Sequence, residues 1–257
     1  MEIVIIGIAA FFTAILTFFS GFGLGTILTP VFIIFFPVEV AIALTGVVHF
    51  TNNLFKIVLV GKSADKAVLL RFGIPAILLA IVGAWLLLRI AEMPALYTYE
   101  LWDRELVITP VKLIIAILLI TFSVLEISPS FRKIQFGRDK LFIGGALSGF
   151  FGGLTGIQGA LRSAFLIKSG LSKEAYIGTG VVIASLVDFT RLSVYASRFA
   201  SADLQENIPL LLTATLAAIA GAWLGKKLLK KVTLRSIQLL VAIMLILISL
   251  AMGSGLI

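Results

Sequence analysis

Apolar runs of 17 to 25 residues, separated by short polar or glycine-rich segments, make up most of this chain. They do not alternate between apolar and polar positions with a period of two, so they predict helices and not barrel strands. A helix of about 20 apolar residues is long enough to cross a bilayer. The uninterrupted runs that we predict to be spanning helices cover residues 38–60, 67–90, 111–127, 173–197, 208–229 and 232–252.

Glycines interrupt two further apolar regions. The first region has runs at 3–19 and 26–36 around the break at 20–25. The second has runs at 141–151 and 157–167 around the break at 152–156. Because glycine permits sharp turns and close backbone approach, each region predicts a broken helical hairpin.

The segment 91–109 departs from the apolar pattern. Its four carboxylates and the aromatic residues Tyr97, Tyr99 and Trp102 suit an interfacial loop better than a spanning helix. Pro110 then fits the first position of the next helix, where its missing N–H costs nothing.

Short identities in the same order indicate an internal duplication. SGF occurs at 20–22 and 148–150, TGVV at 45–48 and 179–182, and GAWL at 83–86 and 221–224. A hairpin adds an even number of membrane crossings and three spans add an odd number, so the halves should be inverted. We therefore predict an all-α polytopic membrane protein of about ten helices in two inverted five-helix repeats. The repeats cover 1–130 and 141–257, with a cytoplasmic linker at 131–140.

Composition places the chain outside the range of soluble domains, with 60% hydrophobic residues, 13% charged residues and a mean hydropathy of +1.14. Of its 21 Lys and Arg residues, 14 fall in the regions 61–71, 128–140, 168–173 and 226–235. Four others, Arg89, Arg104, Lys112 and Arg198, belong to the opposite face. This asymmetry predicts that the first face is cytoplasmic and that both termini are extracytoplasmic. It also explains the net charge of +8 without a nucleic-acid partner.

The three remaining cations, Lys56, Arg162 and Arg191, and the single mid-span acid, Asp188, lie within apolar segments, where charges are expensive and usually functional. Helical spacing places His49, Asn52, Asn53 and Lys56 on one face of their span. Asp188 and Arg191 share a face of the corresponding span in the second half.

The second break adds Gln158 and Arg162, and helix starts near Gly25 or Thr26 and near Gly159 would present unpaired N–H groups. Three cations against one acid leave a net positive centre, which favours a small oxyanion. A metal would call for carboxylates that these spans lack, and the absence of cysteine with a single histidine excludes a Cys/His cluster. We predict no metal and no cofactor.

Structural alternatives exist for each of these residues. Lys56 could extend toward the cytoplasmic surface, and Arg191 could do so toward the outside or pair with Asp188. Arg162 could contact a helix carbonyl or a lipid phosphate. His49, Asn52 and Asn53 could satisfy one another or neighbouring helices without binding substrate.

The glycine breaks resemble the TauE/SafE sulfite exporters, also called the toluene sulfonate uptake permease family. Their motif is similar to G-x-G-G-G-x-aliphatic-x-x-P, once per repeat. Residues 21–30 read GFGLGTILTP, with Gly23 and Gly25 at motif glycines and a departure at Leu24. Residues 156–165 read GIQGALRSAF and depart at the four positions Gln158, Ala160, Arg162 and Phe165. The family's A-x-G-T-S element is similar to residues 43–46 and 177–180.

The resemblance implies a carrier in the cell inner membrane that moves sulfite, an organosulfonate or a related anion, with export the favoured direction. Arg162 and the N–H groups of the breaks would bind the anion, and Gln158 and Asn53 would orient it. An anion channel lined by the same cations is the main alternative. An enzyme is not expected, because no span carries paired carboxylates, an activated nucleophile or a metal cluster. A homodimer remains open.

Overall fold

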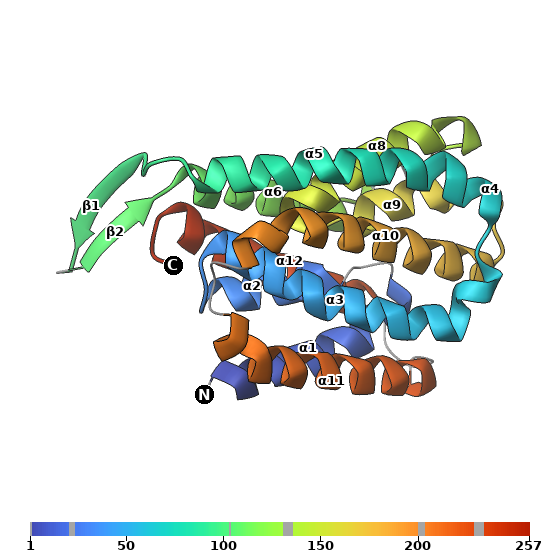
Figure 1. Ribbon diagram of the computed structural model, residues 1–257, viewed down its shortest axis with the longest axis horizontal. Helices are drawn as coiled ribbons and strands as arrows, with labels where there is room; N and C mark the ends of the chain where they lie inside the picture. The colour runs from blue at the N-terminus through green and yellow to red at the C-terminus, as the bar shows by residue number, and fades with distance from the viewer. Residues whose placement is uncertain (1, 21–23, 103, 131–135, 200–203, 229–233) are drawn as a thin grey trace.

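The computed structural model describes residues 2–20, 24–102, 104–130, 136–199, 204–228 and 234–257, and these form a helical bundle with one β-hairpin at its end (Figure 1). Within these ranges the predicted helical character and the number of helices are confirmed. The ten helices of eight residues or more are α1 (Glu2–Ser20), α2 (Leu24–Ile33), α3 (Val38–Val60), α5 (Ile74–Ala91), α6 (Pro110–Ile127), α8 (Leu141–Thr155), α9 (Gly159–Leu166), α10 (Lys173–Phe199), α11 (Leu204–Leu228) and α12 (Leu234–Gly253).

Proline and glycine set several helix boundaries. Helix α3 begins directly after Pro37 and ends at Gly61, as the sequence predicts. Pro110 occupies the first position of α6, and the side chain of Thr109 caps that helix by accepting from the backbone N–H of Lys112.

The helix before Pro75 has an irregular turn. A short helix, α4 (Lys66–Val68), continues into a π-helical turn, η2 (Leu69–Gly73), which leads directly into α5. Proline has no N–H to donate one turn back, and a π-turn is one way in which a helix accommodates that loss. The single run predicted at 67–90 is therefore present, with a wide turn near its start.

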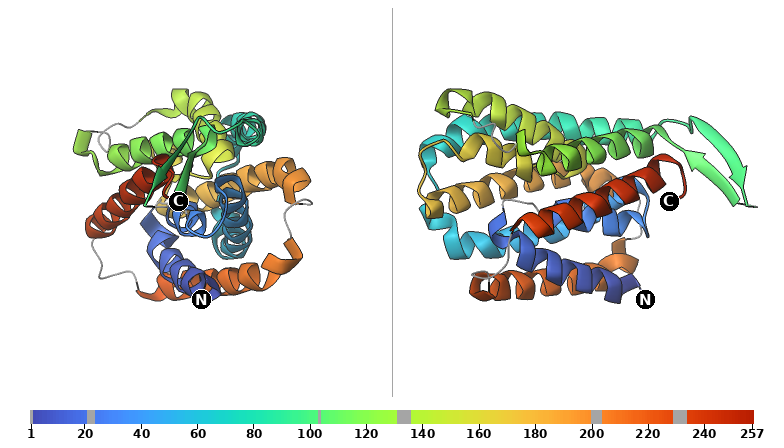
Figure 2. Two further views of the ribbon diagram at one scale, coloured as in Figure 1. Left: turned by 90° about the vertical axis from the view of Figure 1, so that its left-hand side faces the viewer. Right: turned by 180° about the vertical axis from the view of Figure 1, so that it is seen from behind.

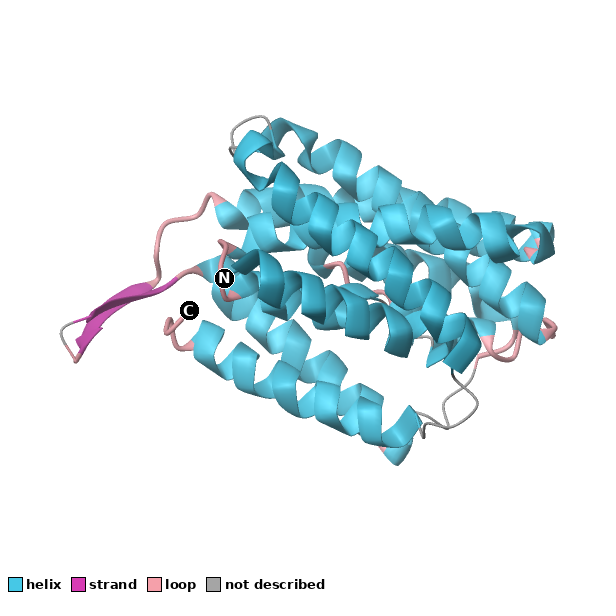
Figure 3. Ribbon diagram, turned by 90° about the horizontal axis from the view of Figure 1, so that it is seen from below, coloured by secondary structure: helices cyan, strands magenta, loops and turns pink. Residues whose placement is uncertain are grey.

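The segment 91–109, predicted to be an interfacial loop and not a spanning helix, contains a β-hairpin that the sequence analysis did not predict. Strand β1 (Tyr97–Leu101) pairs antiparallel with β2 (Arg104–Ile108). It projects beyond the helices (Figure 3). The hydroxyl of Tyr99 donates to the carbonyl of Ser254 at 2.6 Å, so the hairpin is tied to the end of the chain.

Small residues let the outer helices pack closely in pairs. Helix α5 packs along α8, where a Cβ at Gly83 would overlap the carbonyl oxygen of Phe150. Helix α1 packs along α11, where a Cβ at Gly221 would overlap the carbonyl oxygen of Phe11. Such backbone contact is typical of helix association in membranes.

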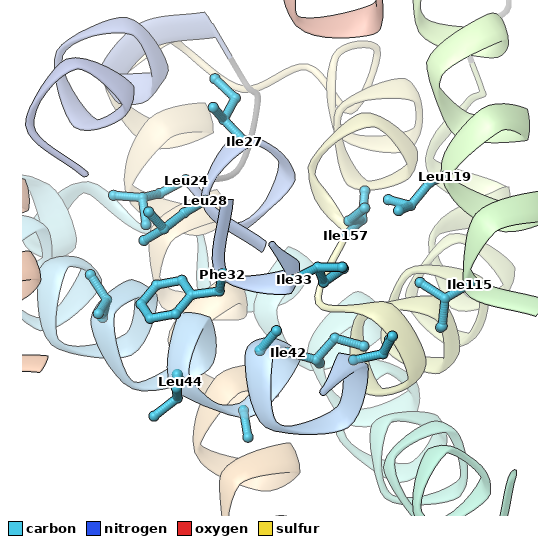
Figure 4. Packing of buried hydrophobic residues seen from close by; sticks show 14 of the residues in the cluster. Leu24, Ile27, Leu28, Phe32, Ile33, Ile42, Leu44, Ile115, Leu119 and Ile157 are labelled. Atoms are coloured by element: carbon cyan, nitrogen blue, oxygen red, sulfur yellow. The ribbon is translucent and has the colours of Figure 1, made fainter. Parts of the chain in front are cut away.

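Helices α3 and α10 contact each other between these two outer pairs, and α6 packs on α12 (Figure 2). The main apolar cluster surrounds α2: Figure 4 shows Leu24, Leu28 and Phe32 of that helix in the same cluster as Ile157 from the second break. Polar groups on α3 and α10 are thereby enclosed by apolar packing.

Four helical segments among the described residues are long and apolar enough to cross a membrane. They are Val38–Ser63, Lys66–Ala91, Lys173–Ala196 and Asn207–Gly225. Shorter apolar helices accompany them at Glu2–Ile15, Leu24–Ile33, Pro110–Leu125 and Ala242–Gly253.

Candidate functional site

Buried polar side chains concentrate where α3 meets α10. The α3 residues His49, Asn52, Asn53 and Lys56, at most 6% exposed, lie on one face, as their spacing predicts. Both Asp188 and Arg191 on α10 are 0% exposed.

Asp188 is the centre of this cluster. Its Oδ2 lies 2.6 Å from Nδ1 of His49, and Asn53 Nδ2 donates to the same oxygen at 3.4 Å. Its Oδ1 accepts from Nε of Arg191 at 3.0 Å, and Arg191 Nη2 also lies 3.0 Å away. One carboxylate thus contacts three side chains from two helices. The ion pair between Arg191 and Asp188, which the sequence analysis named as a structural alternative to substrate binding by Arg191, is present.

The guanidinium of Arg191 extends from this carboxylate toward the glycine-rich backbone. Its Nη1 donates to the carbonyl of Ile42 at 3.4 Å. A Cβ at Gly46 would lie 3.2 Å from Arg191 Cζ, and one at Gly156 would lie 2.8 Å from Nη1. Two glycines from opposite halves of the chain therefore leave room for this one side chain.

The two glycine breaks meet beside Arg191. A Cβ at Gly25, in the first turn of α2, would lie 3.1 Å from the carbonyl oxygen of Gly156. Gly156 ends α8 with a φ of 77°, in the left-handed region that glycine adopts readily. The hydroxyl of Thr155 then accepts from the N–H of Ile157, and α9 begins at Gly159.

Several polar side-chain atoms of α2, α3 and the second break are buried and lack a hydrogen-bond partner among the described residues. They belong to Thr29, Thr45, Asn52, Gln158 and Arg162. For Asn52 and Gln158 both amide atoms are unpaired, and for Arg162 it is Nη1. Leaving such groups buried without a partner costs about 1–3 kcal/mol each, more for a charged group. A bound polar ligand would satisfy them.

Two cations add a positive potential to this region. Arg162 on α9 and Lys56 on α3 are close enough for their like charges to repel, and Arg162 is also attracted by Asp188. Asp188 already pairs with Arg191, so it does not compensate Lys56 and Arg162 fully. The site favours an anion that accepts several hydrogen bonds.

Comparison with known protein families shows to which family the chain belongs. The sequence model of the family described as "Sulfite exporter TauE/SafE" matches residues 6–252 of this chain. The chain belongs to the TauE/SafE sulfite exporter family. No curated protein and no solved structure matches it. The resemblance seen in the glycine motifs is confirmed, and the chain is a multi-pass membrane protein of a transporter family.

The two glycine motifs that resemble the TauE/SafE pattern lie at the two helix breaks. Gly25 and Thr26 lie buried in the first turn of α2, and Gly159 lies buried at the start of α9. Gly23 falls in 21–23, outside the described residues, as does part of the predicted linker at 131–140. The structure therefore describes the backbone of the second motif, with the side chain of residue 160 outside the description, and the first motif only from Leu24 onward.

Sequence reasoning missed two polar residues of this region. Thr45 precedes His49 by one helical turn, and its hydroxyl is buried without a partner. Tyr195 follows Arg191 by one turn, interacts with it, and donates from its buried hydroxyl to the carbonyl of Gly153. The helical spacing that selected His49 and Arg191 would have found both.

Proposed function

We propose that this TauE/SafE family member moves sulfite or another small sulfur-containing anion, organosulfonates included, outward across the cell inner membrane by alternating access. The observation that carries the proposal is that Asn52, Gln158 and Arg162 have buried polar atoms without a partner among the described residues, while Arg162 and Lys56 repel each other as like charges. Such a group is costly without a ligand, and an oxyanion supplies both the negative charge and the acceptors that it lacks.

In this proposal Arg162 and the amides of Asn52 and Gln158 bind the oxyanion directly. Lys56 contributes charge from α3, and the N-termini of α2 and α9 add the positive ends of their helix dipoles. Arg191 is held by Asp188 beside Gly156, so its role is to support the break.

We also propose that the halves form an inverted repeat, which would give alternating access a structural basis. The packing supports this, because α5 contacts α8 as α11 contacts α1. The first and second copies of GAWL place Gly83 and Gly221 in these two interfaces, and Trp85 and Trp223 are each 52% exposed. Helix α1 begins at the end that carries the β-hairpin, whereas α8 begins beside η2 at the opposite end (Figure 1).

Replacing Arg162 tests the proposal most directly. We expect Arg162→Ala to reduce sulfite uptake into proteoliposomes by about tenfold or more, because a charge-assisted hydrogen bond contributes about 1.5–3 kcal/mol. The matched control is Lys168→Ala, which removes an exposed cation just beyond α9 and should retain the flux. Wild-type flux in the Arg162 variant would contradict the assignment of the site.

Counterflow separates a carrier from a channel. Unlabelled sulfite inside the vesicles should accelerate entry of radiolabelled sulfite, since a carrier returns faster when it is loaded. A flux that internal sulfite does not accelerate would instead support an open anion pore lined by the same cations.

A further inference from the structure

The interaction between His49 and Asp188 is not needed to bind an anion, yet it lies within the same cluster. Both side chains are buried, and they come from α3 and α10, which contact each other. A carboxylate can only accept, so the 2.6 Å contact requires the proton of His49 to be on Nδ1. The amide nitrogen of Asn53 lies over the ring, 3.3 Å from Nε2 and 3.4 Å from Nδ1, so it is aligned with neither nitrogen's lone pair. The imidazole in this arrangement is neutral, with one ring nitrogen left to take up a proton.

We infer that His49 is a proton-binding site and that one proton travels with the anion. This inference rests on the proposed function. Without substrate, burial and the charges of Arg191 and Lys56 oppose a positive charge on the ring, and Asp188 is the acid that favours it. An anion bound beside Arg162 and Lys56 offsets that repulsion. Proton uptake and anion binding then strengthen each other, because coupling between two sites is reciprocal.

The groups facing His49 leave few other carriers for this proton. Helix α2, which packs on α3, contains no ionisable residue, and neither does α11 between positions 207 and 225. On α10 the ionisable neighbours of the cluster are Asp188, Arg191 and Tyr195. Among all of these side chains, imidazole is the one whose charge ordinarily changes between about pH 5 and 8.

Protonation would also change a contact within α3. The N–H groups of the Asn53 amide lie over the ring, and a positive charge on the ring disfavours a donor in that position. Protonation therefore favours an amide turned away from the ring, and Asn53 lies one turn before the cation Lys56 on the same helix. The proton balance is simple: water on one side supplies the proton to Nε2, and the ring releases it with the anion on the other side.

Proteoliposomes that contain a trapped pH dye test the inference, with membrane potential clamped. Sulfite itself takes up a proton near neutrality, so methanesulfonate and thiosulfate are the probes, after exchange of radiolabelled sulfite has been measured. In wild-type vesicles the compartment that loses the anion should become alkaline. In His49→Gln, which retains a side-chain donor for Asp188, the protons moved per anion should fall at least tenfold. Thr51→Ala, which removes a hydroxyl bonded within α3, should keep the wild-type ratio.

Calorimetry on the wild-type protein makes the test independent of how well the variant folds. Titration with the same two anions in buffers of different ionisation enthalpy should show proton uptake per anion bound. The affinity should fall by up to about tenfold per pH unit above the range in which His49 titrates. If the anions were exchanged but no proton moved in the vesicles and none was taken up in the calorimeter, this inference would be overturned. The proposed function would remain intact. If none of the three anions, sulfite, methanesulfonate and thiosulfate, were exchanged, the proposed function itself would be overturned.

Discussion

At the scale of single residues, the site depends on where side chains are missing as much as on where they are present. The guanidinium of Arg191 fits between Gly46 and Gly156, which leave it room on two sides. Asp188 then compensates its charge inside the bundle. An unpaired charge at this depth would cost about 3–5 kcal/mol. The glycines and the ion pair are thus parts of one arrangement.

Gly156→Ala should destabilise the protein through two separate effects. A φ of 77° costs a residue with a Cβ about 1–2 kcal/mol, and that Cβ would also lie 2.8 Å from Nη1 of Arg191. The measurement is the thermal unfolding midpoint in detergent, together with sulfite flux.

Gly170→Ala is the matched control for that prediction. Gly170 has a similar φ of 72°, but a Cβ there would meet nothing within 4 Å. This variant should show the backbone cost alone and retain transport. Equal losses of stability in the two variants would mean that contact with Arg191 contributes nothing.

At the scale of helices, equivalent glycines should have equivalent effects. Gly83→Ala and Gly221→Ala each place a methyl group against a backbone carbonyl, that of Phe150 in α8 or of Phe11 in α1. Both should lower the unfolding midpoint, because the paired helices must separate to admit the methyl group.

Gly73→Ala provides the contrasting case, since a Cβ there meets nothing within 4 Å. It should be neutral or stabilising by up to about 1 kcal/mol, the usual difference between glycine and alanine in a helix. A loss of stability in only one of the two GAWL variants would contradict the equivalence of the helix pairs.

Helix positions were more predictable than contacts between helices. Pro37 and Gly61 mark the ends of α3 in the sequence itself, and local spacing places His49 and Asn53 on one face. The contact of His49 with Asp188 joins residues 139 positions apart, so it depends on how α3 and α10 pack. The β-hairpin was missed because its carboxylates outweighed the alternation of Tyr97, Tyr99 and Leu101, which is a strand pattern.

At the scale of the whole molecule, the chain's orientation in the membrane can be tested because the sequence contains no cysteine. The short turn Gly61–Ser63, which contains Lys62, follows α3 at the end of the bundle away from the β-hairpin (Figure 1). The excess of cations in that region favours a cytoplasmic location. Lys62→Cys should therefore react with an impermeant maleimide only after cells are opened.

Glu100→Cys in strand β1 is the counterpart and should react in intact cells. The readout is the mass shift of the labelled protein on a gel. If Lys62→Cys were labelled in intact cells and Glu100→Cys were not, the predicted orientation would be wrong.

The pairing of α1 with α11 has a consequence for how the chain is made. Helix α1 is synthesised well before α11, the helix with which it makes its close glycine contact. Until α11 is inserted, the strip around Phe11 can be covered only by lipid or by an insertion factor. The pairing of α1 must therefore wait for translation of α11, and shortened chains that end before Leu204 would leave α1 without this partner.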